Sequence, residues 1–92
     1  MSSVIEVAFG ISWHKPIVIC DDGERQLTIR GPREALRYLQ HDFPMRSGEA
    51  YWAALAASNR ALMNPAHVER SRETFANAYT EYSLKARRQR KR

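Results

Sequence analysis

The sequence predicts a small α+β domain in which an antiparallel β-hairpin packs against three α-helices, in the order β-β-α-α-α. Three observations support this prediction. The 92 residues suffice for one hydrophobic core and are too few for a second. Two short segments rich in β-branched residues, 17–20 and 26–30, come first, and three segments with helical periodicity follow. Strands that precede a run of helices are typical of the α+β class.

The turn of the hairpin decides which apolar side chains share a face. A two-residue turn at Asp22-Gly23 would place Leu27 opposite Val18 and divide the large aliphatic residues between the two faces. A three-residue turn with Gly23 in the left-handed conformation would place Leu27 opposite Ile17. The large aliphatic residues would then share one face, and we therefore expect this bulged turn. The four residues are Ile17, Ile19, Leu27 and Ile29.

Val18 and Cys20 then lie on the other face of the first strand, where a further surface must cover them. A two-stranded hairpin is only marginally stable alone, so its free edge also needs a partner. Segment 4–9 has a strand-like composition and could supply a third strand, although residues 1–10 could also be disordered. A second copy of the protein could cover the same edge. We favour the strand from the same chain.

The first helix is predicted to begin at Gly31-Pro32, because proline is favoured at the first helical position. It ends by Asp42, because Phe43 precedes a proline and such residues avoid the helical conformation. Its apolar stripe consists of Ala35, Leu36 and Leu39.

The second helix starts after Ser47-Gly48 and ends near Met63. Its predicted inner face consists of Tyr51, Leu55, Ser58 and Leu62, and five alanines widen that surface with small side chains. The third helix starts at Asn64-Pro65, and its stripe consists of Val68, Ser71, Phe75, Ala78 or Tyr79, and Tyr82. No helix breaker follows it, so we expect the helix to fray through Lys85 and beyond.

The net charge of +5 comes from basic residues at the C-terminal end of the chain. The last eight residues hold six basic side chains: Lys85, Arg87, Arg88, Arg90, Lys91 and Arg92. Residues 1–84 form the domain, with nine basic and ten acidic residues and a formal charge of −1, and residues 85–92 form a basic tail. Six cationic side chains could neutralise several phosphates, so the tail is a candidate site for nucleic acid or another polyanion. A solubilising segment without a ligand is the alternative.

The composition of the chain narrows the classes of protein to which it can belong. Hydrophobic residues make up 43% of the chain, which is typical of a globular domain and not of a disordered one. The single cysteine, Cys20, excludes an internal disulfide and is typical of a reducing compartment. The N-terminus has neither a basic region nor a long apolar run, so we expect no signal peptide and no membrane span. These observations predict a cytoplasmic protein.

The sequence predicts no metal, cofactor or catalytic site. His14, His41 and His67 are 27 and 26 residues apart, whereas metal sites usually supply one closely spaced pair of ligands. Cys20 has no base near it in the sequence and is interpreted as structural. No glycine-rich phosphate loop is present. An enzyme would need a pocket assembled from residues such as His14, Arg30 and His41, so we expect no enzyme and no small-molecule substrate.

The two tryptophans are predicted to have different roles. Trp13 is expected to anchor the start of the first strand against the helices, because aromatic side chains bury large areas. Trp52 lies about 100° from Tyr51 on a helical wheel. It is therefore off the inner face, beside Met63. Aromatic and methionine side chains are enriched in interface cores, so Trp52 and Met63 are candidate interface residues together with Val18 and Cys20.

Several short motifs follow one another along the chain: Trp13, Pro16-Ile17-Val18, Gly31-Pro32-Arg33-Glu34-Ala35-Leu36, Phe43-Pro44, Gly48, Tyr51, Ala61-Leu62 and Arg72-Glu73-Thr74-Phe75. In this order and spacing they resemble the small bacterial family catalogued as domain of unknown function 982. The resemblance covers about residues 9–83. Two positions depart from the family pattern: Phe43 stands where tryptophan is usual, and Ser58 where cysteine is common. The resemblance supports the fold and implies no activity.

The sequence thus favours a non-enzymatic protein-interaction domain, acting as a homodimer or with another protein. The alternative hypothesis is a polyanion-binding protein whose basic tail contacts nucleic acid.

Overall fold

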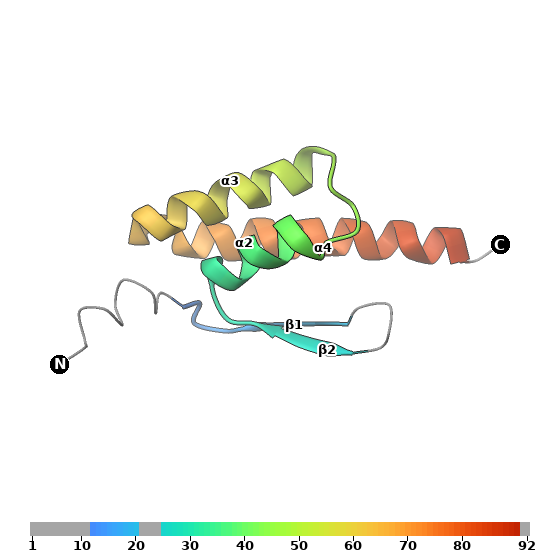
Figure 1. Ribbon diagram of the computed structural model, residues 1–92, viewed down its shortest axis with the longest axis horizontal. Coiled ribbons are helices and arrows are strands. Elements are labelled where there is room, and N and C mark those ends of the chain that lie inside the picture. The colour runs from blue at the N-terminus through green and yellow to red at the C-terminus, as the bar shows by residue number, and fades with distance from the viewer. Residues whose placement is uncertain (1–11, 21–24, 91–92) are drawn as a thin grey trace.

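The computed structural model describes residues 12–20 and 25–90, and Figure 1 shows their arrangement. Two strands come first, β1 (Ile17–Cys20) and β2 (Gln26–Ile29), and they pair antiparallel. Three α-helices follow: α2 (Pro32–His41), α3 (Glu49–Met63) and α4 (Val68–Arg90). A single turn of 3-10 helix, η1 (Pro65–His67), connects α3 to α4. The observed order β-β-α-α-α confirms the predicted α+β class.

The three helices pack against one another, with the hairpin on one side of them. α3 contacts both α2 and α4 along its length. Figure 1 shows α3 and the hairpin on opposite sides of α2 and α4. The outer side of α3 and the outer face of the hairpin therefore look away from each other.

The strands pair in a register that differs from the predicted one. Ile17 lies opposite Ile29, and Ile19 lies opposite Leu27. Residues 21–25 connect the strands, in place of a three-residue turn. The predicted pairing of Leu27 with Ile17 is therefore wrong.

Pro16 explains why the predicted register is unfavourable. That register would place Pro16 opposite Thr28, and proline has no N–H to donate to a strand partner. The inward face is nevertheless the predicted one, with Ile19 and Ile29 buried. Because side chains alternate with a period of two, a shift by two residues changes the partners and keeps the faces. Gly23 lies outside the described residues.

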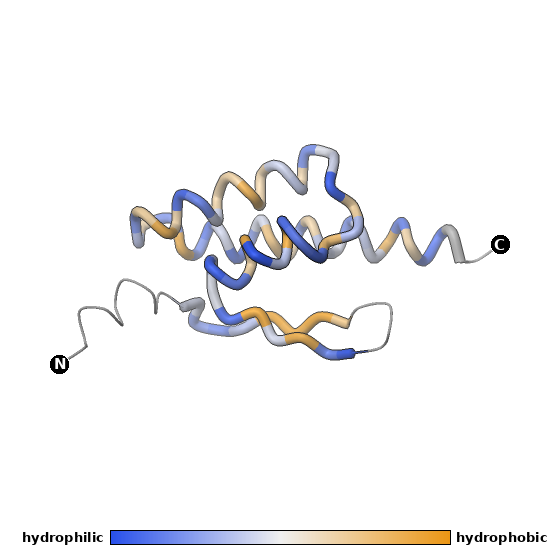
Figure 2. Tube along the Cα trace, viewed as in Figure 1, coloured by the Kyte–Doolittle hydropathy of each residue, from blue (hydrophilic) through white to orange (hydrophobic). Residues whose placement is uncertain are grey.

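Val18 and Cys20 lie on the outer face of the hairpin, as predicted, and both are exposed there. Figure 2 shows that β1 is hydrophobic throughout its length, although only one of its faces covers the core. The predicted third strand at residues 4–9 lies outside the described residues.

Trp13 anchors the chain before β1 against α4, as predicted. Its side chain is only 4% exposed, and its Nε1 donates a hydrogen bond of 3.0 Å to Ser71 Oγ. Its ring centroid lies 5.8 Å from that of the fully buried Phe75. An aromatic cluster completes this core with Tyr38, Phe43 and Tyr51.

The boundaries of α2 and α3 agree closely with the predicted ones, because local signals set them. α4 begins at Val68 instead of the predicted Asn64-Pro65, since Pro65–His67 form the 3-10 turn η1. α2 has Gly31 as its N-cap and Pro32 in its first turn, and it ends before Asp42. α3 begins after Gly48, which has a φ of 95° and a ψ of 161°. Residues other than glycine rarely adopt this backbone conformation.

The buried face of α3 differs from the prediction in its leucines. Tyr51 and Ser58 are buried as predicted, but Leu55 and Leu62 are only half-buried. Three alanines are buried instead: Ala54, Ala57 and Ala61. Small side chains let neighbouring helices approach closely, so the contact is centred on the alanines and the leucines lie at its margin.

α4 continues through most of the predicted tail. Ser71, Phe75 and Ala78 are buried on its inner face, as predicted, and Tyr82 lies at the margin of the core. The helix then continues without interruption to Arg90. The first six residues of the basic tail are thus helical.

Candidate interaction surfaces

The four residues predicted to form an interface are all exposed, but they lie on two surfaces. Val18 is 58% exposed and shares the outer face of β1 with Cys20. Trp52 is 58% exposed and Met63 is 86% exposed, and both belong to α3. Because β1 and α3 lie on opposite sides of α2 and α4 (Figure 1), the fold does not join the two pairs into one surface.

The outer edge of β1 is held by side chains of α4. Along a paired strand, the backbone N–H and C=O groups of successive residues point alternately to the two edges of the strand. The N–H and C=O of Cys20 point away from β2. The Cys20 N–H donates to Tyr79 Oη at 3.2 Å, and the Tyr79 hydroxyl donates to the Cys20 carbonyl at 2.8 Å. Arg72 Nε donates to the Lys15 carbonyl at 2.8 Å. At Cys20, this edge therefore has no backbone group left for a further strand.

The exposed residues of α3 form a surface that we call the α3 outer face. It consists of seven residues: Glu49, Trp52, Ala53, Ala56, Asn59, Arg60 and Met63. At 100° per residue they cover an arc of about 120° around the helix. Only Glu49 and Arg60 are charged, and they lie in the first and last turns.

Trp52 is held in place by the core although most of its side chain faces solvent. Its ring contacts that of the buried Tyr51 edge to face, with centroids 4.9 Å apart. The Tyr51 ring in turn stacks on Phe43 at 6.1 Å, and the Tyr51 hydroxyl donates to the Leu39 carbonyl at 3.3 Å. A large apolar side chain backed by a rigid neighbour can bind a partner with little loss of conformational entropy.

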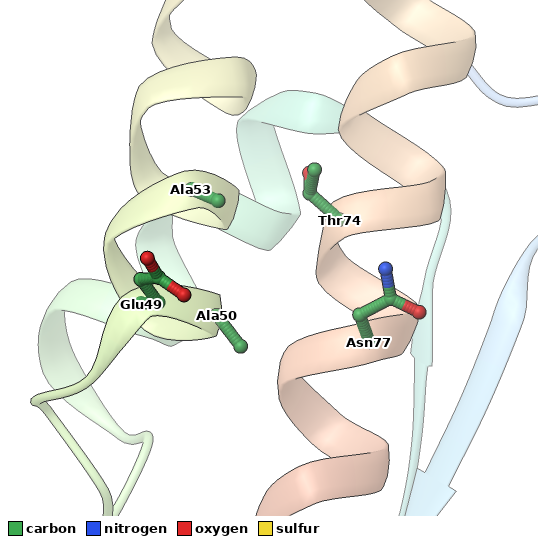
Figure 3. A pocket seen from close by; sticks show the side chains of 5 residues that line it. All are labelled: Glu49, Ala50, Ala53, Thr74 and Asn77. Atoms are coloured by element: carbon green, nitrogen blue, oxygen red, sulfur yellow. The ribbon is translucent and has the colours of Figure 1, made fainter.

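A cleft of about 390 Å³ adjoins the α3 outer face, between the first turns of α3 and the middle of α4. Figure 3 shows its lining residues: Glu49, Ala50, Ala53, Thr74 and Asn77. The Thr74 hydroxyl donates its single hydrogen towards the carbonyls of Arg70 and Ser71, at 2.9 Å and 3.1 Å, and its oxygen can still accept. The Glu49 carboxylate and the Asn77 amide are the other polar groups that line this cleft.

The end of α4 carries the predicted polyanion site away from the core. Tyr82 is the last aromatic residue that packs on the core, with its ring centroid 5.5 Å from that of Phe43. Figure 1 shows the following turns extending beyond the other elements. Lys85 forms an ion pair with Glu81 at 3.6 Å, and Arg87 and Arg88 are exposed. Arg90 is the last residue of the helix, and residues 91–92 lie outside the described residues.

The histidines lie apart from the cleft. His14 and His41 are exposed and His67 is half-buried, and neither they nor Arg30 line the cleft. Within residues 12–20 and 25–90, no three His, Cys, Asp or Glu side chains are grouped so as to hold a metal ion. None of the helices in these ranges is long and apolar enough to cross a membrane.

Comparison with protein families gives a match that covers most of the chain. The model of a family described as protein of unknown function (DUF982) matches residues 15–86. The chain belongs to the DUF982 family. No curated protein and no solved structure matches it. The DUF982 match covers the α3 outer face and the cleft, but it ends before Arg87, so five of the six basic residues lie beyond it.

The residues that carry the DUF982 resemblance are structural. Trp13, Phe43 and Phe75 are core residues, and Gly48 caps α3. Ser58, which stands where the family commonly has cysteine, is fully buried, and its hydroxyl makes no hydrogen bond with a described residue. The family pattern therefore predicts the fold of this chain and leaves the exposed surfaces unexplained.

Proposed function

We propose that this DUF982 protein is a non-enzymatic protein-interaction domain and that the α3 outer face is its contact surface. The observation that carries the proposal is the composition of α3, where only two of the 15 residues are charged and both lie near its ends. A helix that is apolar on all sides is typical of a helix buried on all sides. In the monomer, one side of α3 faces solvent.

The chemistry of the surface supports the same proposal. Trp52 and Met63 are of the types enriched at interface cores, and the alanines between them allow a partner to approach the helix backbone. The fixed position of Trp52 against Tyr51 is typical of an anchor residue, which contributes most of the binding free energy at an interface.

Substitution of Trp52 tests this function. We expect Trp52→Glu to abolish association, measured by light scattering after size exclusion for self-association and by affinity capture for other proteins. Val18→Glu is the matched control, because Val18 is 58% exposed, as Trp52 is, and lies on β1, on the opposite side of α2 and α4 from α3 (Figure 1). The proposal is refuted if the wild type is monomeric and captures no protein that Trp52→Glu loses and Val18→Glu retains.

A second candidate function, binding of duplex nucleic acid, is favoured by the end of α4. At 100° per residue, Lys85, Arg87 and Arg88 lie at about 0°, 200° and 300° around the helix. Charges on all sides suit a helix lying in the major groove, which has phosphates on both sides and is wide enough for an α-helix. They do not suit a membrane surface, where a helix needs one apolar face.

The salt dependence of binding tests this second function. If all six basic residues contact phosphates, the affinity for a short DNA duplex should fall with salt with a log–log slope of about −5. A variant with these six residues replaced by glutamine should lose the binding, whereas Trp52→Glu should retain it. Equal affinity of the glutamine variant and the wild type, measured by fluorescence anisotropy, would exclude the basic helix as the site.

A further inference from the structure

Given the proposed function, on which this step rests, we infer that the partner of the α3 outer face is a second copy of the same chain. In the inferred dimer the two α3 helices are antiparallel. Arg60 of each protomer then enters the cleft of the other, beside Glu49 and Asn77 of that protomer.

The charges of the surface are complementary to those of an antiparallel copy. Glu49 and Arg60 are the only charged residues of the α3 outer face, and neither forms an ion pair with another described residue. They are 11 residues apart, which is about 16 Å along the axis and about 20° around it. In an antiparallel dimer, a two-fold axis midway between these two residues places Arg60 of each protomer opposite Glu49 of the other. A parallel arrangement would instead bring like charges together.

The small residues at the middle of the α3 outer face fit the same arrangement. The two-fold axis that pairs Glu49 with the partner's Arg60 passes between positions 54 and 55 of α3. It sets Ala53 against the partner's Ala56, so the two helices can approach closely where they cross. Trp52 lies beside this contact on the same outer face.

The cleft provides a place for the arginine. In the antiparallel arrangement Arg60 lies opposite Glu49 of the other protomer, which lines the cleft together with Ala50 and Ala53. The alanine walls leave about 390 Å³ for its apolar stem. The guanidinium, which has five N–H donors, would meet the Glu49 carboxylate, and Asn77 lies across the cleft on α4 (Figure 3).

The size of the surface predicts a dimer that depends on concentration. The α3 outer face has seven residues, whereas a stable interface has about 20–30 on each side. Sedimentation velocity should therefore extend to about 1 mM, where an association of only about 4 kcal/mol still populates the dimer. A reducing agent is required, because the thiol of Cys20 is exposed.

Charge reversal tests the antiparallel arrangement. Each of Glu49→Arg and Arg60→Glu alone should weaken the dimer about tenfold, because two symmetric contacts change from attraction to repulsion. An equimolar mixture of the two variants should restore it, since both contacts between the unlike chains are then attractive. The double variant E49R/R60E should also restore it.

Two control variants separate this effect from changes in net charge or helix stability. Glu69→Arg removes an exposed acid from the first turn of α4, as Glu49→Arg does from the first turn of α3. Arg37→Glu reverses an exposed base on α2. Both controls should dimerise like the wild type.

The outcomes separate the inference from the proposed function. A dimer that Trp52→Glu abolishes, but that neither the mixture nor the double variant restores, overturns the antiparallel arrangement and leaves the proposed function intact. A wild type that is monomeric at the highest concentration overturns the inference, and the proposed function then depends on a different protein. Loss after single reversal and recovery in both restored forms supports the inference.

Discussion

Removal of one hydroxyl group should release the edge of β1. Tyr79 makes two hydrogen bonds to the backbone of Cys20, at 3.2 Å and 2.8 Å, across 59 residues of sequence. Tyr79→Phe retains the ring and removes both bonds. A hydrogen bond contributes about 0.5–1.5 kcal/mol net, and water can reach the exposed Cys20, so we expect a loss of about 1–2 kcal/mol in the free energy of unfolding. For a domain of this size each kcal/mol lowers the melting temperature by about 4–8 °C.

Amide hydrogen exchange gives the local readout. The Cys20 N–H is protected by the Tyr79 oxygen alone, whereas alternation along the strand directs the Ile19 N–H towards β2. In Tyr79→Phe the Cys20 amide should exchange as fast as in an open segment, and the Ile19 amide should stay protected. Tyr51→Phe is the control, because it removes one tyrosine hydrogen bond far from the sheet. Unchanged exchange at Cys20 in the Tyr79 variant would refute the proposed role of the hydroxyl.

Three further predictions concern the core and one helix cap. Ser58→Ala should raise the free energy of unfolding by about 1 kcal/mol, because it removes a buried hydroxyl that has no partner among the described residues; a clear loss in urea denaturation would show that the hydroxyl has a partner. Trp13→Phe and Ser71→Ala should each destabilise by about 1–3 kcal/mol, and the double variant by less than their sum, since they share one hydrogen bond. Strict additivity in thermal denaturation would contradict this coupling. Gly48→Ala should cost about 1–3 kcal/mol from its backbone conformation alone, because an added Cβ would meet no atom within 4 Å; a neutral result in calorimetry would argue against strain at the cap.

The candidate surfaces were only partly predictable. Trp52 and Met63 could be placed on the exposed side of α3, since a helical wheel depends on spacing alone. The role of Glu49 and Asn77 in the cleft was missed, because the cleft forms only where α3 and α4 meet. Tyr79 was predicted as an alternative to Ala78 in the apolar stripe of the third helix, and its ring lies at the margin of the core. Its bond to Cys20 has no signal in the sequence.

The sequence by itself determined the order of the elements, the boundaries of α2 and α3, and the inward face of the hairpin. Those features depend on steric and hydrogen-bonding rules that act over a few residues, such as proline in the first turn of α2 and alternation along β1. The tertiary structure alone decided the strand register, the alanine-centred packing of α3 and the hydrogen bonds of Tyr79 to the β1 edge at Cys20. Each of these is a choice among contacts between residues far apart in the chain, where several arrangements satisfy the same local rules and packing of the whole core selects one.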